Sequence, residues 1–220
     1  KFFEMTKVSA IMSGLRCMIL AGIVCFGYAI PVGASETPRF LILGDSLTAG
    51  YGLLPDQVFA VRLKEALRRF GVDVEIANAS VSGDTTAAGL ARLDWALAVR
   101  PTHVMVELGA NDMLRGVDPI VTRVNLDKII TELKDRRIQV MLAGMYAAPN
   151  LGRRYAQNFA RIYRDLANKH QIPLYPFFLS GVAANPGLNL ADGMHPNQKG
   201  IQVIIDRILP TVVRFLGMKE

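Results

Sequence analysis

From residue 38 onward, short apolar runs alternate with longer segments of helical periodicity. Apolar runs of about four to eight residues bounded by turn residues are typical of buried strands, whereas apolar positions three and four residues apart are typical of helices. We therefore expect strands at residues 40–43, 72–77, 103–108, 139–143 and 172–178. We expect helices at residues 58–70, 85–99, 118–137, 154–170 and 198–216.

This alternation predicts the fold class. Strands that alternate with helices form parallel sheets with helices on both faces. The last predicted strand contains Pro173 and Pro176, so we expect it to be short or to lie at an edge of the sheet. The pattern shows neither internal repeats nor low-complexity linkers. The sequence therefore predicts one α/β domain with a doubly wound, parallel, five-stranded sheet.

The first 34 residues have the composition of a secretory signal peptide. Basic residues precede an apolar stretch at residues 17–30, and small residues at 32–34 offer a cleavage site. The apolar stretch is shorter than the about 20 residues that a membrane span needs. We expect a cleaved signal peptide at residues 1–34, a single domain at residues 35–220, and a protein that is exported from the cytoplasm. An uncleaved N-terminal anchor is the alternative.

Charge and cysteine content narrow the function classes. The whole chain carries a net charge of +6, and without the three basic residues and one acidic residue of the first 34 the net charge is +4. The basic residues are scattered, and no basic stripe is interleaved with aromatic residues, which argues against nucleic-acid binding. Cys17 and Cys25 both lie in the predicted signal peptide. We therefore expect a domain without disulfides or thiol chemistry.

Small and polar residues follow three predicted strands and precede the last predicted helix. These segments are residues 44–46, 78–84, 109–112 and 192–197. In open α/β sheets ligands bind outside the carboxyl ends of the strands, so we expect the first three segments to converge. Acyl transfer needs a nucleophile, a base oriented by a third group, and donors aimed at the developing oxyanion. These segments hold residue types that fit each of those roles.

Ser46 is the leading candidate for the nucleophile. His195 is a candidate base, and Asp192, three residues earlier, can orient its imidazole. Gly83 can present a backbone N–H at close range because it has no side chain. Asn111 can present a side-chain amide, a group that serves in oxyanion holes.

Other residues compete for two of these roles. Ser80 and Ser82 also follow a strand and compete with Ser46. A serine in that position can also simply cap the next helix. Three further acids compete with Asp192 as the orienting carboxylate: Asp45, Asp84 and Asp112.

The chain contains three histidines. His103 opens an apolar strand, and His170 ends a helix, where a cation suits the helix dipole. Elimination therefore favours His195 as the base. The three histidines do not share the spacing of metal ligands, so we expect no metal site.

Four sequence blocks together resemble the SGNH (GDSL) hydrolase family. They read GDSLTAGYG at 44–52, NASVSGDT at 78–85, GAND at 109–112 and DGMHPN at 192–197. The resemblance is strongest with the bacterial secreted acyl-CoA thioesterase I, arylesterase and lysophospholipase subgroup. It implies a flavodoxin-like, three-layer α/β/α sandwich without a cofactor.

Carried over residue by residue, the resemblance implies a triad of Ser46, His195 and Asp192. It also implies an oxyanion hole formed by the N–H groups of Ser46 and Gly83 and the amide of Asn111. The implied reaction is hydrolysis of acyl esters or thioesters, lysophospholipids among them, through an acyl-enzyme on Ser46. We expect small-molecule substrates, a monomer, and at most peripheral membrane contact. Together with the signal segment, the resemblance also implies a periplasmic or secreted bacterial protein.

Apolar residues in the loops around the predicted site indicate an acyl pocket. They are Leu53, Leu54, Met113, Leu114, Met145, Tyr146, Leu188, Leu190 and Met194. We expect residues 145–155 to form a flap over this pocket. A carbohydrate O-acetylesterase of the same family is the alternative, although Trp95, expected in the core, is then not placed to stack on a sugar. A non-catalytic binding module is a third hypothesis, because fold alone does not fix function.

Overall fold

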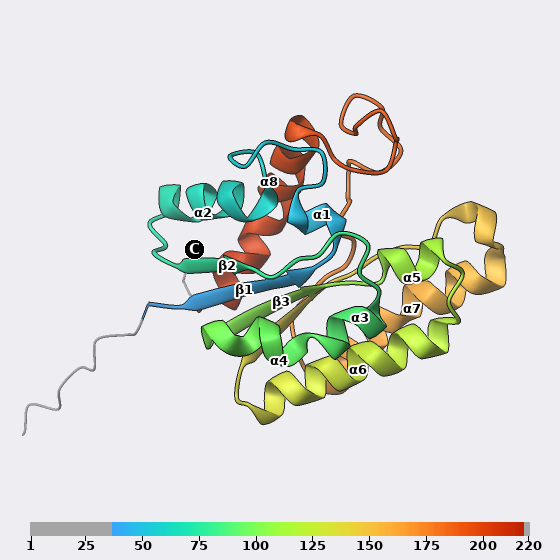
Figure 1. Cartoon of the computed structure of the whole chain (residues 1–220), viewed down its shortest axis with the longest axis horizontal. Helices are drawn as coiled ribbons and strands as arrows, with labels where there is room; N and C mark the ends of the chain where they lie inside the picture. Colours follow the sequence, from blue (N-terminus) through green and yellow to red (C-terminus); the bar gives the residue numbers. More distant parts are fainter. Residues whose placement is uncertain (1–36, 218–220) are drawn as a thin grey trace, which may run out of the picture. The chain divides into compact units, whose positions relative to one another are not determined.

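The structure is a computed structural model that describes residues 37–217 (Figure 1), so the expected signal peptide lies outside the described residues. Its sheet has the strand order β2-β1-β3-β4-β5, and all neighbouring strands are parallel. The five strands are β1 (Arg39–Gly44), β2 (Glu75–Asn78), β3 (His103–Glu107), β4 (Gln139–Ala143) and β5 (Leu174–Tyr175). The expected parallel five-stranded sheet is confirmed.

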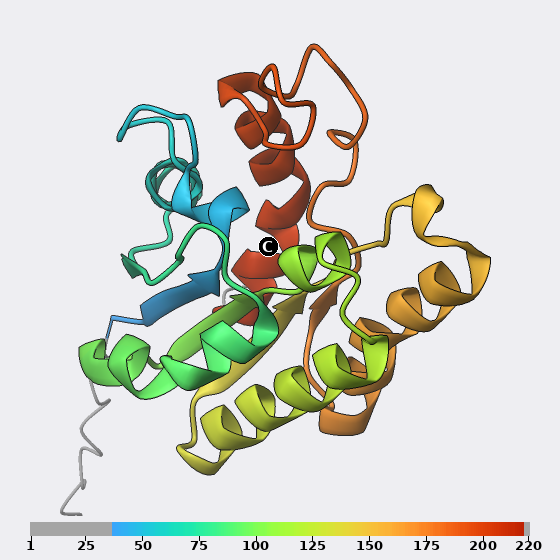
Figure 2. The ribbon, with the colours of Figure 1, turned by 45° about the vertical axis from the view of Figure 1, so that its right-hand side comes forward.

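Helices cover both faces of this sheet (Figures 1 and 2). Helices α2 and α8 pack together on one face, and α3, α6 and α7 pack on the other, which gives the expected three layers. The α-helices are α1 (Ser46–Ala49), α2 (Phe59–Arg69), α3 (Thr86–Ala91), α4 (Leu93–Ala96), α5 (Ala110–Leu114), α6 (Pro119–Asp135), α7 (Arg153–His170) and α8 (Gln198–Phe215). Two short 3₁₀ helices lie at Leu97–Val99 and Pro149–Leu151. Among the described helices, none is both long and apolar enough to cross a bilayer.

The central strands are apolar on both faces because both faces are covered. The residues of β1 from Phe40 to Leu43 are at most 1% exposed, as is typical of a parallel strand between two helix layers. The register pairs Gly44 at the end of β1 with Glu107 at the end of β3. The loops that follow these two strands therefore start side by side at one edge of the sheet.

Three local features differ from the sequence expectations. The expected helix over residues 85–99 is divided into α3, α4 and a 3₁₀ turn, with a break at Arg92 (φ −105°, ψ 13°). Beyond the break, Leu93 and Ala96 face the core, while Trp95 is 67% exposed. The expectation that Trp95 lies in the core is therefore wrong: the buried positions Thr86, Gly89, Leu93 and Ala96 recur three and four residues apart, and Trp95 lies between them on the exposed side. The short helices α1 and α5 are not evident from periodicity, since each is too short to complete a pattern.

Candidate active site

Ser46 stands directly after the buried strand β1 and begins helix α1. The side chain of Asp45 caps this helix by accepting a hydrogen bond from the N–H of Leu47 at 3.0 Å. Gly50 ends the helix in the left-handed conformation, with φ 86°. This tight turn from strand to helix holds Ser46 at the carboxyl edge of the sheet, where ligands bind in open α/β folds.

Ser46, His195 and Asp192 form a continuous series of hydrogen bonds. The Ser46 Oγ lies 2.9 Å from Nε2 of His195, and Nδ1 of the same ring lies 2.7 Å from Oδ2 of Asp192. The other Asp192 oxygen accepts the backbone N–H groups of His195 at 3.0 Å and Met194 at 2.8 Å. The backbone bond from His195, the one from Met194 and the bond from the imidazole lower the pKa of Asp192 to about 2. The carboxylate is therefore ionised at neutral pH and can orient the ring.

The loop that carries His195 is fixed by its own hydrogen bonds. The carbonyl of His195 accepts the N–H of Leu190 at 2.8 Å. The side-chain amide of Asn197 donates to the carbonyls of Gly187 and Asn189, each at 3.1 Å. Its oxygen caps the N-terminus of α8. One asparagine thus joins the loop to a long, buried helix and fixes where the imidazole stands.

An aromatic ring also contacts the imidazole. The rings of Tyr51 and His195 are tilted by 35°, with their centroids 4.4 Å apart. This contact is absent from the sequence expectations, although Tyr51 belongs to the first of the four sequence blocks. A ring at this distance limits the orientations that the imidazole can adopt.

Gly83 and Asn111 line one cavity together with Ser46 and His195. The Asn111 amide donates to Oδ2 of Asp45 at 3.1 Å and to the carbonyl of Asp84 at 3.0 Å. Gly83 has a φ of 86°, a left-handed conformation that side chains disfavour. All five predicted site residues are thus brought together, with Asp192 held against the far side of the His195 ring.

Two carboxyl groups are buried beneath this site. Asp45 and Glu107 are both fully buried. Burial raises the pKa of Asp45 to about 6. Burial, together with the nearby Asp45, raises the pKa of Glu107 well above its usual range. The Glu107 carboxyl accepts the hydroxyl of Thr48 at 3.2 Å. A Cβ at Gly44 would come within 2.1 Å of the Thr48 hydroxyl, so glycine is required there.

Arg92 joins the ends of two neighbouring strands. Its Nε lies 2.5 Å from Oδ2 of Asp84. Its two terminal nitrogens donate to the carbonyl of Ala79 at 2.6 Å and to that of Gly44 at 3.2 Å. The guanidinium therefore connects the end of β1 to the loop that carries Gly83. Sequence analysis did not single out Arg92, because its partners are distant in the sequence.

Ser80 and Ser82, the other candidates for the nucleophile, have surroundings that differ from those of Ser46. Ser80 Oγ lies 2.8 Å from the Thr48 hydroxyl. Ser82 lines the cavity, but within residues 37–217 it is Ser46 whose hydroxyl is hydrogen-bonded to a histidine ring.

The competing acids and histidines are also engaged elsewhere. The buried Asp112 accepts the hydroxyls of Thr86 at 2.5 Å and Thr122 at 3.2 Å, while Asp45 and Asp84 have the partners given above. The His103 ring bonds to Thr102 and packs on Phe215, and that of His170 bonds to Asp127. Within the described range, no group of three or more His, Cys, Asp or Glu side chains is placed to hold a metal ion.

The cavity beside Ser46 has a volume of about 730 Å³. Five of the nine apolar residues expected there line it: Met113, Leu114, Met145, Tyr146 and Met194. The other four are not among the lining residues: Leu53, Leu54, Leu188 and Leu190. The segment after β5 supplies a further wall that the sequence did not indicate, formed by Phe177, Leu179, Ala183 and Ala184. Phe177 stacks on Tyr146 with a centroid distance of 4.6 Å. The result is an apolar cavity with a few convergent polar groups, which suits an acyl chain.

A parallel α/β/α sandwich with a Ser–His–Asp hydrogen-bond series at its carboxyl edge defines the class of serine hydrolases. The model of the GDSL-like Lipase/Acylhydrolase family matches residues 42–203 of this sequence. The chain belongs to that family and is a hydrolase of carboxylic esters or thioesters.

Several proteins of known name are similar in sequence to this protein over most of its length. It is 38% identical to an arylesterase of Vibrio mimicus over 90% of this chain and 98% of that protein. It is 36% identical to esterase TesA of Pseudomonas aeruginosa, with the same two coverages. The crystal structure of TesA superposes with a TM-score of 0.77 at 38% identity, over 80% of this chain and 99% of the other. The esterase AlinE4 gives a TM-score of 0.70 at 43% identity, over 82% and 97% of the two chains.

Proposed function

We propose that Ser46 is the nucleophile of an enzyme that hydrolyses esters and thioesters of apolar acyl groups, lysophospholipids among them. The observation that carries this proposal is the hydrogen-bond series Ser46–His195–Asp192 at the wall of an apolar cavity. A protein that only binds a ligand has no need for this series. Its position beside an apolar cavity favours substrates with an acyl chain over purely polar ones.

The geometry supports a two-step reaction. In the first step Ser46 Oγ attacks the acyl carbonyl while its proton passes to Nε2 of His195. The ionised Asp192 stabilises the imidazolium, which then gives the proton to the leaving alcohol or thiol. The acyl group remains on Ser46 as an ester.

Water completes the cycle. His195 takes a proton from a water molecule, whose oxygen attacks the acyl-enzyme, and the proton then returns to Ser46 Oγ as the acid leaves. In both steps negative charge develops on the carbonyl oxygen. The N–H groups of Ser46 and Gly83 and the amide of Asn111 are the proposed donors to that oxygen; one such donor contributes about 2.7–4 kcal/mol in a comparable site.

The names of the relatives agree with this substrate class. They are an arylesterase, the esterase TesA, and "Thioesterase 1/protease 1/lysophospholipase L1" of Escherichia coli K12, which is 38% identical over 79% of this chain. We propose that this enzyme works as a monomer, as one domain spanning residues 35–220, in the periplasm or outside the cell. Removal of residues 1–34 is tested by N-terminal sequencing of the protein recovered from the periplasm of a bacterial host.

The decisive experiment compares the parent protein with Ser46→Ala on p-nitrophenyl esters from acetyl to palmitoyl. Ser82→Ala is the matched control, because Ser82 lines the same cavity but has no bond to His195. We expect Ser46→Ala to lose nearly all activity and Ser82→Ala to keep it. Full activity in Ser46→Ala would refute the proposed nucleophile, and activity confined to acetyl esters would refute the proposed acyl chain.

A further inference from the structure

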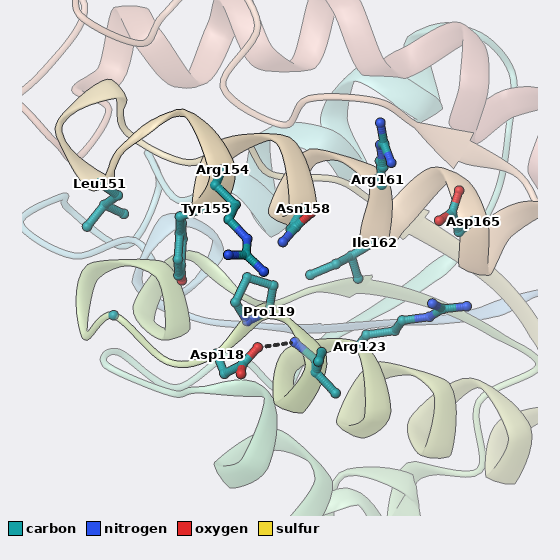
Figure 3. A pocket seen from close by; sticks show the side chains of 12 residues that line it. Asp118, Pro119, Arg123, Leu151, Arg154, Tyr155, Asn158, Arg161, Ile162 and Asp165 are labelled. Atoms are coloured by element: carbon teal, nitrogen blue, oxygen red, sulfur yellow. Dashed lines mark hydrogen bonds between the residues drawn. The ribbon is translucent and has the colours of Figure 1, made fainter.

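A second cavity, of about 810 Å³, lies between the beginning of α6 and the first half of α7 (Figure 3). Gly116, in the segment between α5 and α6, lines this groove, while Leu114 at the end of α5 lines the active-site cavity. On the other side, Leu151 and Tyr155 line the groove, close in sequence to Ala148 of the active-site wall. The α6–α7 groove is therefore a neighbour of the proposed catalytic site.

Positive charge predominates in this groove. Three arginines line it, Arg123 from α6 and Arg154 and Arg161 from α7. Figure 3 shows Arg154 reaching from α7 toward the start of α6. Two acids also line it: Asp118 caps α6 by accepting the N–H of Ile120 at 2.9 Å, and Asp165 lies 3.9 Å from Nε of Arg164, so three cations face two anions. Among residues 37–217, no carboxylate forms an ion pair with any of the three arginines.

Beside the arginines, the first two turns of α6 expose aliphatic side chains. Ile120, Val121 and Val124 are between 45% and 67% exposed. At 100° per residue these three positions lie within one 100° arc of the helix. Lys128 lies on the same side of α6, opposite its buried residues, whereas Arg123 is exposed at the edge of this side that faces α7. These exposed side chains contribute little to the packing of the domain, because they face solvent.

Asp127, the acid of α6 nearest to the arc, is paired with cations. Both oxygens of Asp127 accept Lys169 Nζ, at 2.8 Å and 2.7 Å, and one also lies 2.5 Å from Nε2 of His170. These bonds lower the pKa of Asp127, first through Lys169, so that it stays ionised and paired. The exposed arc therefore presents aliphatic groups and unpaired cations together.

We propose that this arc and the α6–α7 groove form a docking surface for bilayers that contain anionic phospholipids. Apolar insertion and attraction between basic side chains and anionic lipid together give stable peripheral binding, whereas either alone is marginal. Ile120, Val121 and Val124 enter the interfacial region, and Arg123 and Arg154 bind lipid phosphates, which guanidinium groups match in geometry.

This docking surface rests on the proposed function and adds to it a way for the enzyme to reach lipid substrates. Helix α5 and the beginning of α6 lie toward the same edge of the sheet as Ser46 (Figures 1 and 2). Exposed apolar side chains also stand at the active-site cavity, which Leu114, Tyr146 and Met194 line. An adsorbed molecule would thus hold its acyl cavity near the lipid surface, where lysophospholipids reside.

Vesicle binding is measured with Ser46→Ala protein, because this variant should not hydrolyse the lipid. The full-length sequence is expressed in a bacterial host, so that any signal peptide is removed before purification. Vesicles of phosphatidylcholine, with and without phosphatidylglycerol, are sedimented at low and high salt. Two variants change the surface: Arg123→Glu/Arg154→Glu and Ile120→Ser/Val124→Ser. The matched controls are Arg68→Glu/Arg69→Glu and Phe70→Ser, at exposed positions at the end of α2 on the other face of the sheet.

We expect binding to vesicles with phosphatidylglycerol that weakens at high salt. Each surface variant should lower the partition coefficient about tenfold or more, since each lost cation or buried aliphatic group weakens adsorption several-fold, and the controls should bind like the parent. If the surface variants bind as tightly as the parent, adsorption comes from another segment and the proposal is overturned. If the parent does not bind at all, the proposal is also overturned. Dimerisation of the parent in gel filtration that the Ile120→Ser/Val124→Ser change abolishes would overturn it too, because the arc would then be a protein interface.

Soluble esters separate the two proposals. With Ser46 present, the surface variants should hydrolyse p-nitrophenyl butyrate at the parent rate. Failure of vesicle binding with this rate intact rejects the docking surface alone. Loss of hydrolysis in the parent would instead reject the proposed function.

Discussion

The side-chain amide of Asn111 is held between the carboxylate of Asp45, at 3.1 Å, and the carbonyl of Asp84, at 3.0 Å. Both N–H bonds of the amide are therefore engaged within the protein. Donation to a developing oxyanion requires one of these bonds to be shared. The residue before the proposed nucleophile thus decides where one of the proposed oxyanion donors points.

Replacing Asp45 by asparagine should lower the rate without unfolding the protein. The new side chain can still cap α1 through its oxygen, but it presents an NH₂ group where the Asn111 amide needs an acceptor. We expect kcat for p-nitrophenyl butyrate to fall about tenfold or more, with little change in KM, because complete loss of such a donor costs about 10²- to 10³-fold. An unchanged kcat would show that Asp45 does not position Asn111.

The same carboxyl should make stability depend on pH. Burial raises the pKa of Asp45 to about 6 from its usual value of 3.8. A carboxyl with a raised folded-state pKa favours folding below its unfolded pKa, and this contribution is lost as the pH rises through the folded pKa. Relative to Asp45→Asn, the parent should therefore lose unfolding free energy between about pH 4 and pH 6, by roughly 3 kcal/mol at most. Urea unfolding of both proteins across this range measures the difference, and parallel curves would contradict it.

Tyr51 should support catalysis through its ring rather than its hydroxyl. An aromatic ring whose centroid lies 4.4 Å from that of the His195 ring limits the orientations that the imidazole can adopt. Tyr51→Ala should lower kcat several-fold, and Tyr51→Phe should restore it. Equal rates in all three proteins would rule the contact out.

Filling the cavity should shorten the preferred acyl chain. Ala183 lines the wall supplied by the segment after β5. Ala183→Trp should lower kcat/KM for long-chain p-nitrophenyl esters far more than for the acetyl ester. Leu54→Trp is the control, since Leu54 is exposed and does not line the cavity. If both variants keep the parent's chain-length profile, the acyl chain does not lie along this wall.

Arg92 should be important for stability. Removing its guanidinium leaves two carbonyls and the carboxylate of Asp84 without their partner in a largely buried setting. We expect Arg92→Met to lower the unfolding free energy by about 3–5 kcal/mol, the range for breaking a buried pair. Arg92→Lys should recover only part of this, because an ammonium group cannot reproduce the planar fork. Urea denaturation measures both variants.

Much of this architecture is readable from the sequence, because strands buried on both faces must be apolar throughout. Residues 139–143 are predicted and found as a strand, and Pro173 and Pro176 restrict β5 to two residues. Trp95 shows the limit. Its expected burial rests on residue type, but the buried positions Gly89, Leu93 and Ala96 recur three and four residues apart and leave the tryptophan on the exposed side.

The active site, too, contains residues that the sequence predicts and residues that it does not. The five residues predicted from the four sequence blocks converge, since parallel strands bring their following loops to one edge. In the sequence Glu107 reads only as a residue of the strand expected at 103–108, and its burial becomes evident only from the approach of Gly44 and Thr48. Tyr51 acquires its contact with the imidazole only when the last loop folds over it.

The hydrogen bond between Ser46 and His195 joins residues 149 positions apart in the chain. The histidine loop is fixed by the capping of α8, the last helix of the described chain. On the proposed mechanism, a polypeptide still being synthesised or exported already has its serine but lacks the base that activates it. Hydrolytic activity is therefore among the last properties that a newly made molecule acquires, and the cell that produces it is not exposed to a working esterase while the chain is still incomplete.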